Sequence, residues 1–268
     1  MISIVVPTYN RPSRVKRLLE VLQPQLEKHR GRVEVVVVDD GGDLPVSYFP
    51  EKESGQVRFF RTERNQGPSS ARNLGIRESL GSTIAFLDDD VVPARDYLDE
   101  LFVFLEEYPE IQVAVGHLEA LNTDIYARFW KECYESVFGS STEPDVIYPV
   151  PMFSTGLGLV RRELLERNGF QPLFAVELRT GEDYDFFRRV ESAGLQVWKC
   201  DRILAYNETR NDLFSFLEQR YSYWKYGKAR RKASDPRVRF RLSLQCRCLD
   251  YLVQAYIFFR STKERLFR

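Results

Sequence analysis

The segment IAFLDDDVVP, residues 84–93, constrains the fold of this chain more than any other part of its sequence. Residues 84–87 are apolar and predict a buried β-strand, and three consecutive carboxylates follow, Asp88, Asp89 and Asp90. Neighbouring carboxylates repel one another, and each loses hydration when it is held in a folded site. Either this run is a solvated acidic turn or it faces a cation, for which a divalent metal ion that carries a phosphate is the best candidate.

The first half of the chain alternates strand-like and helix-like segments. Residues 2–7 predict a short buried strand, and an apolar stripe from Val15 to Leu26 follows at helical spacing. Pro68 near the start and Gly81 after the end mark another helix. This alternation indicates an α/β fold with a mainly parallel sheet flanked by helices. Further strands are expected in residues 33–40, 57–61, 82–90, 111–116 and 195–200, helices in 94–107 and 183–193, and a strand followed by a helix in 154–170.

Three of the expected strands end in polar or acidic residues. In α/β sheets, ligands bind beyond the carboxyl ends of the strands, and parallel strands bring these ends to one edge. We therefore expect residues that are far apart in the sequence to line one cleft, which favours a functional site over a solvated turn. The residues expected there are Pro7, Thr8, Tyr9, Asn10, Asp39, Asp40, Asp88, Asp89 and Asp90.

The composition excludes several classes of protein. No apolar run reaches the roughly 18 residues that span a bilayer, and the N-terminal MISIVVPTYN lacks the pattern of a secretory signal. We therefore expect a cytoplasmic protein. His29 and His117 are the only histidines and the four cysteines are scattered, which leaves little material for a histidine-dependent nucleophile or a zinc site. No G-x-G-x-x-G follows the first strand, so a dinucleotide dehydrogenase is not expected.

The net charge is zero, but basic residues gather towards the C-terminus. From Leu213 onward the chain has 14 Lys or Arg against 4 Asp or Glu, and the pattern from residue 211 predicts helices. Such asymmetry predicts contact with something anionic, which would be a membrane surface, a phosphorylated acceptor or the acidic body, while a solvated helix face is the plain alternative. A nucleic-acid partner is not expected. The basic residues are Lys225, Lys228, Arg230, Arg231, Lys232, Arg237, Arg239 and Arg241.

Residues 117–150 mix aromatic side chains with the polar stretch FGSSTEPDVIYP. Core packing is the simpler interpretation of these aromatic residues, and a mobile loop over a binding site is the alternative. They are Tyr126, Phe129, Trp130, Tyr134 and Phe138.

Five segments occur in a characteristic order: SIVVPTYNRP, VVVVDDGG, NQGPSSARNLGI, AFLDDDVVP and TGEDYDFFRRV. Together they resemble the family 2 glycosyltransferases with the GT-A fold. The resemblance implies transfer of a sugar, with inversion, from a nucleoside diphosphate donor (UDP or dTDP) to a hydroxyl of a glycan or lipid-linked acceptor, as in polysaccharide biosynthesis. It also implies a catalytic domain over residues 1–210, with a donor half of about 1–116 and an acceptor half of about 117–210. The charge and helical pattern described above predict a basic helical extension over residues 211–268.

The resemblance assigns the chemistry to acidic residues. Asp90 would be the direct ligand of Mn²⁺ or Mg²⁺, which would offset the charge of the leaving diphosphate. Asp88 and Asp89 would reach the ribose, the donor sugar or, through water, the metal ion, and Asp88 is counted with Asp90 as a metal-site residue. Asp183 would be the general base, ionised at the start of a helix, although an ordinary first-turn acid is the plain alternative. Glu182 would contact the acceptor or a neighbouring loop.

The resemblance also implies a set of residues around the nucleotide. Asp40, or its neighbour Asp39, would accept a hydrogen bond from the base, which suits uracil or thymine. Arg72 would bind near the diphosphate or hold the loop, and a structural salt bridge is its alternative role. The full set is Pro7, Thr8, Tyr9, Asn10, Asp39, Asp40, Arg72, Asn73, Asp88 and Asp89.

One motif departs from the family pattern. Many relatives have a His after the last strand that completes the metal site, whereas this chain has ILAYNETR there. Asn207 or Glu208 would replace it, or the acidic run, phosphates and water would suffice. The departure leaves open a non-catalytic nucleotide-sugar-binding protein of the same fold. A nucleotidyltransferase is less consistent, because PTYNRPSR has no glycine for a phosphate loop.

Overall fold

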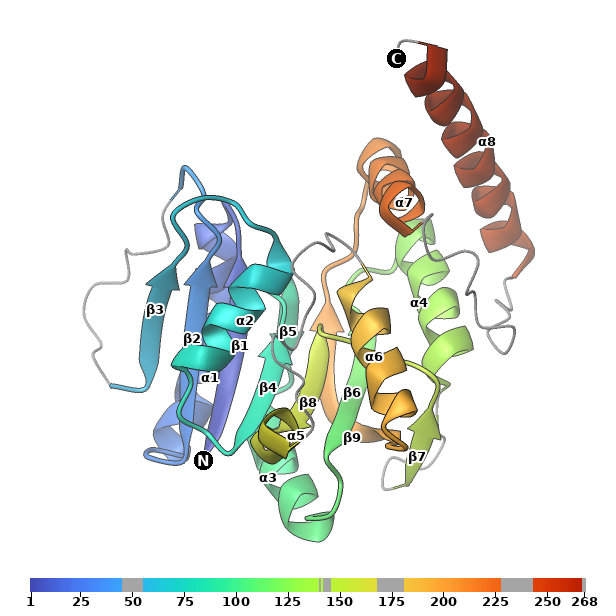
Figure 1. Cartoon of the computed structure of the whole chain (residues 1–268). Helices are drawn as coiled ribbons and strands as arrows, with labels where there is room; N and C mark the ends of the chain where they lie inside the picture. Colours follow the sequence, from blue (N-terminus) through green and yellow to red (C-terminus); the bar gives the residue numbers. More distant parts are fainter. Residues whose placement is uncertain (45–54, 140, 142–145, 168–180, 228–242, 267–268) are drawn as a thin grey trace. The chain divides into compact units, whose positions relative to one another are not determined.

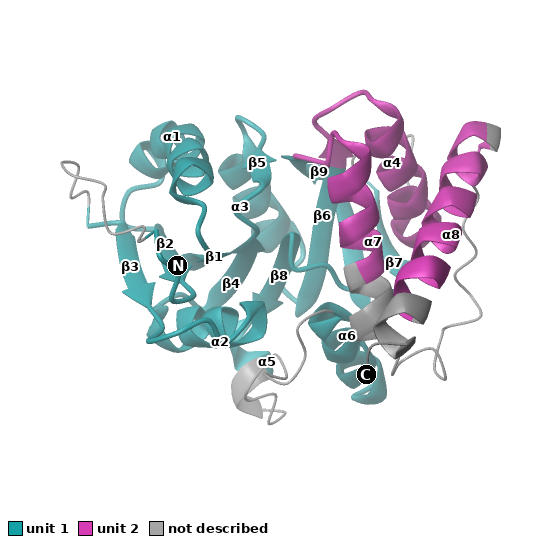
Figure 2. Cartoon of the chain, turned by 90° about the horizontal axis from the view of Figure 1, so that it is seen from above, with its two compact units in different colours: residues 1–118, 141–207 teal, residues 119–140, 208–268 magenta. Residues whose placement is uncertain are grey.

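The chain falls into two compact units, which are described one at a time. Unit 1 contains residues 1–118 and 141–207, and unit 2 contains residues 119–140 and 208–268 (Figure 2). The predicted functional division at residue 210 stays a prediction. The computed structural model (Figure 1) describes residues 1–44, 55–139, 141, 146–167, 181–227 and 243–266.

Unit 1 is built on a mixed sheet in the order β3-β2-β1-β4-β8-β6-β9-β5, in which β7 also pairs with β9. The first four strands in this order pair in parallel, while β4 with β8, β8 with β6, β9 with β5 and β9 with β7 pair antiparallel. The α/β class is therefore confirmed, and the sheet expected to be mainly parallel is mixed: among these pairings, only those that join β3, β2, β1 and β4 are parallel. The strands are β1 (Ile2–Thr8), β2 (Val33–Asp39), β3 (Val57–Arg61), β4 (Thr83–Leu87), β5 (Val91–Pro93), β6 (Val113–Ala120), β7 (Ile147–Val150), β8 (Leu157–Arg161) and β9 (Val197–Asn207).

Helices cover both faces of this sheet, which explains its continuous apolar strands. Every residue of β1 and β2 is buried, as expected for strands that are covered on both sides. Figure 2 shows α1 and α3 on one face and α2, α5 and α6 on the other. Helix α2 lies so close to β1 that a Cβ on Gly75 would stand 2.4 Å from Val5 Cγ1. The helices are α1 (Pro12–Lys28), α2 (Pro68–Glu78), α3 (Tyr97–Glu107), α5 (Arg162–Arg167) and α6 (Glu182–Ser192).

Unit 2 consists of α4 (Ile125–Phe138), α7 (Leu213–Gly227) and α8 (Leu244–Leu266). Its core joins the three helices: Phe129 lies edge-on to Phe216, and Val253 belongs to the same buried cluster. The aromatic residues of 125–138 therefore form a helix with a packed face, which agrees with core packing. Of the predicted basic residues, 228–241 and the Lys225 side chain lie outside the described residues. None of the described helices combines the length and apolar character needed to cross a bilayer.

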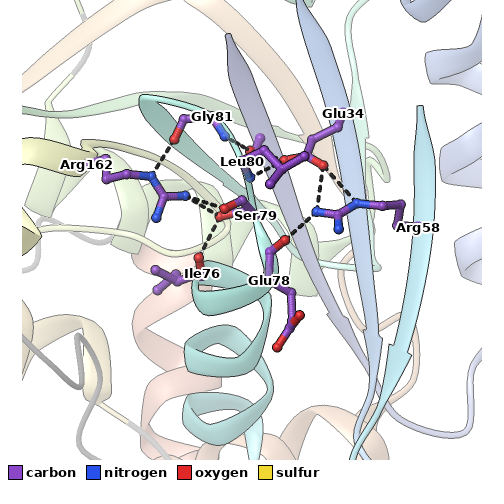
Figure 3. A network of polar contacts seen from close by, with 9 residues as sticks. Glu34, Arg58, Ile76, Glu78, Ser79, Leu80, Gly81 and Arg162 are labelled. Atoms are coloured by element: carbon purple, nitrogen blue, oxygen red, sulfur yellow. Dashed lines mark hydrogen bonds and ion pairs between the residues drawn. The ribbon is translucent and has the colours of Figure 1, made fainter. Parts of the chain in front are cut away.

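A buried carboxylate fastens the amino-terminal edge of the sheet in unit 1 (Figure 3). Glu34 of β2 accepts hydrogen bonds from Ser3 Oγ (2.6 Å) and Leu80 N (2.5 Å), and its Oε2 lies 2.8 Å from Arg58 Nη2. Arg58 also donates to the Glu78 carbonyl at the end of α2. From the other side, Arg162 donates to the Ser79 carbonyl at 2.8 Å. The turn between α2 and β4 is therefore held by two arginines and one carboxylate.

Replacing Glu34 by Gln should lower the free energy of unfolding by about 1–3 kcal/mol, because the buried carboxylate would be replaced by an amide whose NH₂ group cannot accept from Ser3, Leu80 or Arg58. Urea unfolding measures this loss. Glu106 provides the matched control, since its side chain is 72% exposed and pairs with Arg32 only at 3.4 Å, so E106Q should leave the midpoint unchanged. Equal midpoints for E34Q and the wild type would contradict the proposed role of Glu34.

Candidate active site

The acidic run forms a tight turn at the carboxyl end of β4. Leu87 is fully buried and ends the strand, and Val91 N donates a hydrogen bond to the Asp88 carbonyl at 3.1 Å. Val91 then begins β5, opposite Asn207 of β9. The run is thus held between two strands of the sheet rather than in an exposed loop, and Asp89 is only 7% exposed. A fully solvated turn is excluded by this burial.

Two arginines at the start of α1 face the acidic run. Arg11 Nη1 donates to Asp89 Oδ1 at 2.8 Å, and Arg14 Nη1 donates to Asp90 Oδ2 at 3.1 Å. Thr8, the last residue of β1, donates its hydroxyl to Asp89 Oδ2 at 2.7 Å. The sequence motifs alone did not predict a role for Arg11 and Arg14, although both lie in the YNRPSR segment that directly follows β1.

Arg72 of α2 joins the acidic run to the helix that carries the expected base. Its Nη2 lies 2.7 Å from Asp88 Oδ1, and its Nη1 lies 2.7 Å from Glu182 Oε1. Both Arg72 and Glu182 are buried. Burial alone would lower the pKa of Arg72, but Asp88 and Glu182 raise it above its ordinary value, so the guanidinium stays charged. The structural salt bridge expected as the alternative role of Arg72 is therefore present, and it pairs Arg72 with two predicted site residues, Asp88 and Glu182.

Asp183 follows Glu182 in the first turn of α6, where the helix dipole favours negative charge. Its side chain is half-buried, and its Oδ1 accepts a hydrogen bond from Tyr184 N at 2.7 Å. Through Glu182 and Arg72, this turn is connected to the end of β4. A first-turn acid and a general base would both occupy such a position.

The three arginines do not fully compensate the acidic run. Burial raises the pKa of Asp90 to about 6, and the charges of Asp88 and Asp89 act in the same direction, against Arg11 and Arg14. An ionised Asp90 is therefore costly to the folded chain near neutral pH. A cation at this edge would relieve that cost.

Asp39 and Asp40, at the end of β2, hold two loops. Asp40 accepts hydrogen bonds from Thr62 Oγ1, from Gln66 N (both 3.0 Å) and from Gly67 N (2.7 Å). Asp39 accepts from Arg61 Nη1 at 2.9 Å and from Gly42 N at 3.2 Å. Both carboxylates are buried, and these contacts tie each of them to a neighbouring loop.

The ends of β1 and β2 approach each other closely. Asp40 N donates to the Thr8 carbonyl at 2.8 Å, and Asn10 Oδ1 accepts from Leu44 N at 3.0 Å. Asn10 has a φ of 56°, and a Cβ on Gly42 would stand 2.3 Å from its Oδ1, so this contact requires a glycine. With the Thr8–Asp89 bond, these contacts bring the polar ends of β1, β2 and β4 together. Of the other predicted residues, Pro7 is buried in β1, Tyr9 is 42% exposed, and Asn73 lies half-buried on α2.

The carboxylates of the acidic run are suitable ligands for a divalent cation, but the protein side chains that the structure describes do not alone form a complete coordination site. Carboxylate oxygens are the ligands that Mg²⁺ and Mn²⁺ prefer. Across the described ranges, however, no group of three His, Cys, Asp or Glu side chains could hold a metal ion. Asn207, considered as a substitute for the missing His, lies in β9 opposite Val91. Oxygens of a bound diphosphate and water would have to complete the coordination.

Comparison with curated proteins gives one family. The model of glycosyl transferase family 2 matches residues 3–169. An uncharacterized glycosyltransferase of Rickettsia felis is 28% identical over 185 residues, which cover 68% of this chain and 29% of the relative. The succinoglycan biosynthesis protein ExoO of Rhizobium meliloti is 30% identical over 191 residues, 68% of this chain and 53% of the relative. The chain thus spans less than a third of the length of the first relative and about half of the second.

Solved structures with low sequence identity share the fold. TarS 1–349 of S. aureus in complex with UDP-GlcNAc has a TM-score of 0.61 at 22% identity over 82% of this chain and 64% of that chain. The mannosyltransferase of Pyrobaculum calidifontis in complex with GDP-Man and Mn²⁺ has a TM-score of 0.59 at 19% identity, and the match covers 88% of this chain and 65% of that chain. These likenesses confirm the GT-A fold expected from the motifs.

Replacing Asp90 by Asn should stabilise the metal-free protein at neutral pH. With its raised pKa, the Asp90 contribution to stability is fully present below the ordinary value of 3.8 and is lost as the pH rises through about 6. Because D90N lacks this loss, its melting temperature should exceed that of the wild type at about pH 8, and the gap should shrink towards about pH 5. Thermal unfolding in a chelating buffer measures both values, and a gap independent of pH would contradict the prediction.

Proposed function

Because this chain belongs to glycosyl transferase family 2, we propose that it transfers a sugar from a nucleoside diphosphate donor to a hydroxyl group of a glycan or lipid-linked acceptor. The family predicted from five motifs is confirmed by a match that covers more than half of the chain. The observation that carries the proposal is the double ion pair of Arg72, at 2.7 Å to both Asp88 and Glu182. It connects the acidic strand end to the helix turn that contains Asp183.

The donor is proposed to be a UDP or dTDP sugar. TarS, which was solved with UDP-GlcNAc, supports this donor. ExoO, a protein of succinoglycan biosynthesis, supports a glycan product. The uracil or thymine ring of the donor would lie at the edge formed by the ends of β1 and β2, near Tyr9 and Asp39 or Asp40. Both carboxylates already accept hydrogen bonds from protein loops. The nucleobase would therefore bind to the main chain of those loops as well as to a carboxylate.

In the proposed reaction, the acceptor hydroxyl gives its proton to the Asp183 carboxylate. Its oxygen then forms a bond to the anomeric carbon while the bond from that carbon to the β-phosphate oxygen breaks, and the nucleoside diphosphate leaves with the electron pair. Attack opposite the leaving group inverts the anomeric configuration. A Mn²⁺ or Mg²⁺ ion, held by Asp90 and Asp88, would offset the charge of the diphosphate. Arg11 and Arg14 would orient Asp89 and Asp90 for these contacts.

Replacing Asp183 by Asn should reduce sugar transfer by about 100- to 10,000-fold, because the amide cannot accept the proton. Donor binding should be retained, since Asp183 is proposed to act on the acceptor. Transfer is measured by release of the nucleoside diphosphate with a panel of donors and Mn²⁺, and donor binding is measured by thermal shift.

Asp185 provides the matched control for this experiment. It lies in the same turn of α6 but pairs with Arg189 at 3.2 Å, so D185N should transfer sugar at close to the normal rate. Normal transfer by D183N would exclude Asp183 as the base. Donor binding without any transfer by the wild type would favour the non-catalytic nucleotide-sugar-binding alternative.

We further propose that unit 2 contacts an anionic membrane surface. Within α8, Leu249, Val253 and Ile257 face the core of unit 2, while a second set of large apolar side chains is exposed. Aromatic residues on an exposed helix face suit the membrane interface, and the 14 basic residues from Leu213 onward suit anionic lipids. The exposed set is Tyr251 (75%), Leu252 (55%), Phe258 (66%) and Phe259 (72%).

Replacing Phe258 and Phe259 together by Ser should reduce co-sedimentation with phosphatidylglycerol vesicles several-fold, because two exposed apolar side chains would be lost. Gln254→Ala, on the exposed surface of the same helix, is the control and should bind as the wild type does. Phosphatidylcholine vesicles test the contribution of charge. Equal binding of the double variant and the wild type to both vesicles would argue against this surface.

A further inference from the structure

A hollow of about 250 Å³ lies in unit 1 at the end of β6 that is remote from the acidic site. Its wall includes Gln112, which directly precedes β6. At the other end of β6, Leu118 contacts the glycine beside the acidic run: a Cβ on Gly156 would stand 3.3 Å from Leu118 Cδ1 and 3.6 Å from Asp88 Oδ2. The hollow and the acidic site are therefore separate features of one sheet.

The wall of the hollow combines aromatic surface with polar groups that can still form hydrogen bonds. Tyr108 and Trp198 line it and are both half-buried, so part of each ring is accessible. Within the part of the chain that the structure describes, no hydrogen bond joins the Tyr108 hydroxyl or the Trp198 indole N–H to another residue. Gln196 donates its amide to Val197 O at 2.9 Å, which leaves its side-chain oxygen as an acceptor.

The charges around the hollow disfavour an ionic ligand. Its only charged lining residue among those described is Glu110, which would repel a phosphate or carboxylate and is insufficient alone to hold a metal ion. Arg161 lies near Glu110, but its guanidinium donates to the carbonyls of Ile111 (3.3 Å) and Leu105 (3.2 Å). A neutral ligand with both C–H faces and hydroxyl groups fits this wall best.

We propose that this hollow binds a neutral sugar ring of a glycan chain, away from the site of transfer. The C–H face of the ring would lie on Trp198 or Tyr108, whose π faces carry partial negative charge, and hydroxyl groups would bond to Glu110, Gln112 and Gln196. The identity of the ligand as an acceptor rests on the proposed function. Binding a distant part of the same chain would raise the effective concentration of its acceptor end.

Saturation-transfer NMR with maltohexaose, cellohexaose and laminarihexaose tests this site without requiring catalysis. The wild type should bind at least one of these neutral glycans. Trp198→Leu should weaken that binding at least tenfold, whereas Trp198→Phe, which keeps a ring, should retain most of it. Tyr108→Ala gives a second variant in case Trp198→Leu does not fold, and thermal unfolding checks both proteins.

Asp185→Asn, which lies outside the hollow and pairs with Arg189 on α6, serves as the control and should bind the glycan as tightly as the wild type. Failure of the wild type to bind any of the three glycans at millimolar concentration, or unchanged binding by both Trp198→Leu and Tyr108→Ala, would overturn the proposal. Tighter binding of inorganic phosphate than of glycans would do the same. If the wild type transfers sugar but binds no glycan in the hollow, only this inference is contradicted. If the wild type binds glycan but transfers no sugar, only the proposed function is contradicted.

Discussion

The candidate site depends on how one strand end carries three adjacent negative charges. Asp88, Asp89 and Asp90 each face a guanidinium group, at distances of 2.7–3.1 Å. This pairing lets the acidic run fold at the end of a buried strand, yet the pKa of Asp90 remains raised to about 6. The residual negative charge distinguishes this edge from an ordinary set of ion pairs, and it makes the edge suitable for a cation and a diphosphate.

The same kind of interaction serves a different purpose at the opposite edge of the sheet. There the buried Glu34 carboxylate accepts from Arg58, Ser3 and Leu80, so hydrogen-bond donors from three segments compensate its negative charge. Removing one partner of a buried ion pair leaves an uncompensated buried charge, which strongly destabilises the fold. The amino-terminal edge is thus built for stability, whereas the carboxyl edge keeps unbalanced charge close to the first turn of α6.

Much of the fold could be predicted from the sequence because its strong signals are local. Continuous apolar runs predicted β1, β2 and β4, and Pro12 and Pro68 mark the starts of α1 and α2. The antiparallel half gave weaker signals: β5 has 3 residues and β7 has 4, too few for a periodic pattern. Strand β9 extends to Asn207, beyond the expected residue 200, because its later residues pair with β5. Helix α4 was not predicted from the sequence, because its aromatic residues are consistent with both a packed core and a loop.

By itself, the sequence determined the α/β class, the family, and the acidic residues on which the proposed chemistry depends, because these are carried by contiguous motifs. Only the tertiary structure decided which cations face those acids. Arg11 and Asp89 are 78 positions apart, and Arg72 and Glu182 are 110 apart, so no local pattern pairs them. It also decided that Asp39 and Asp40 hold loops and that Trp198 lines a hollow with Tyr108. Such pairings arise when folding brings strand ends and helix starts to one edge, and spacing along the chain does not encode them.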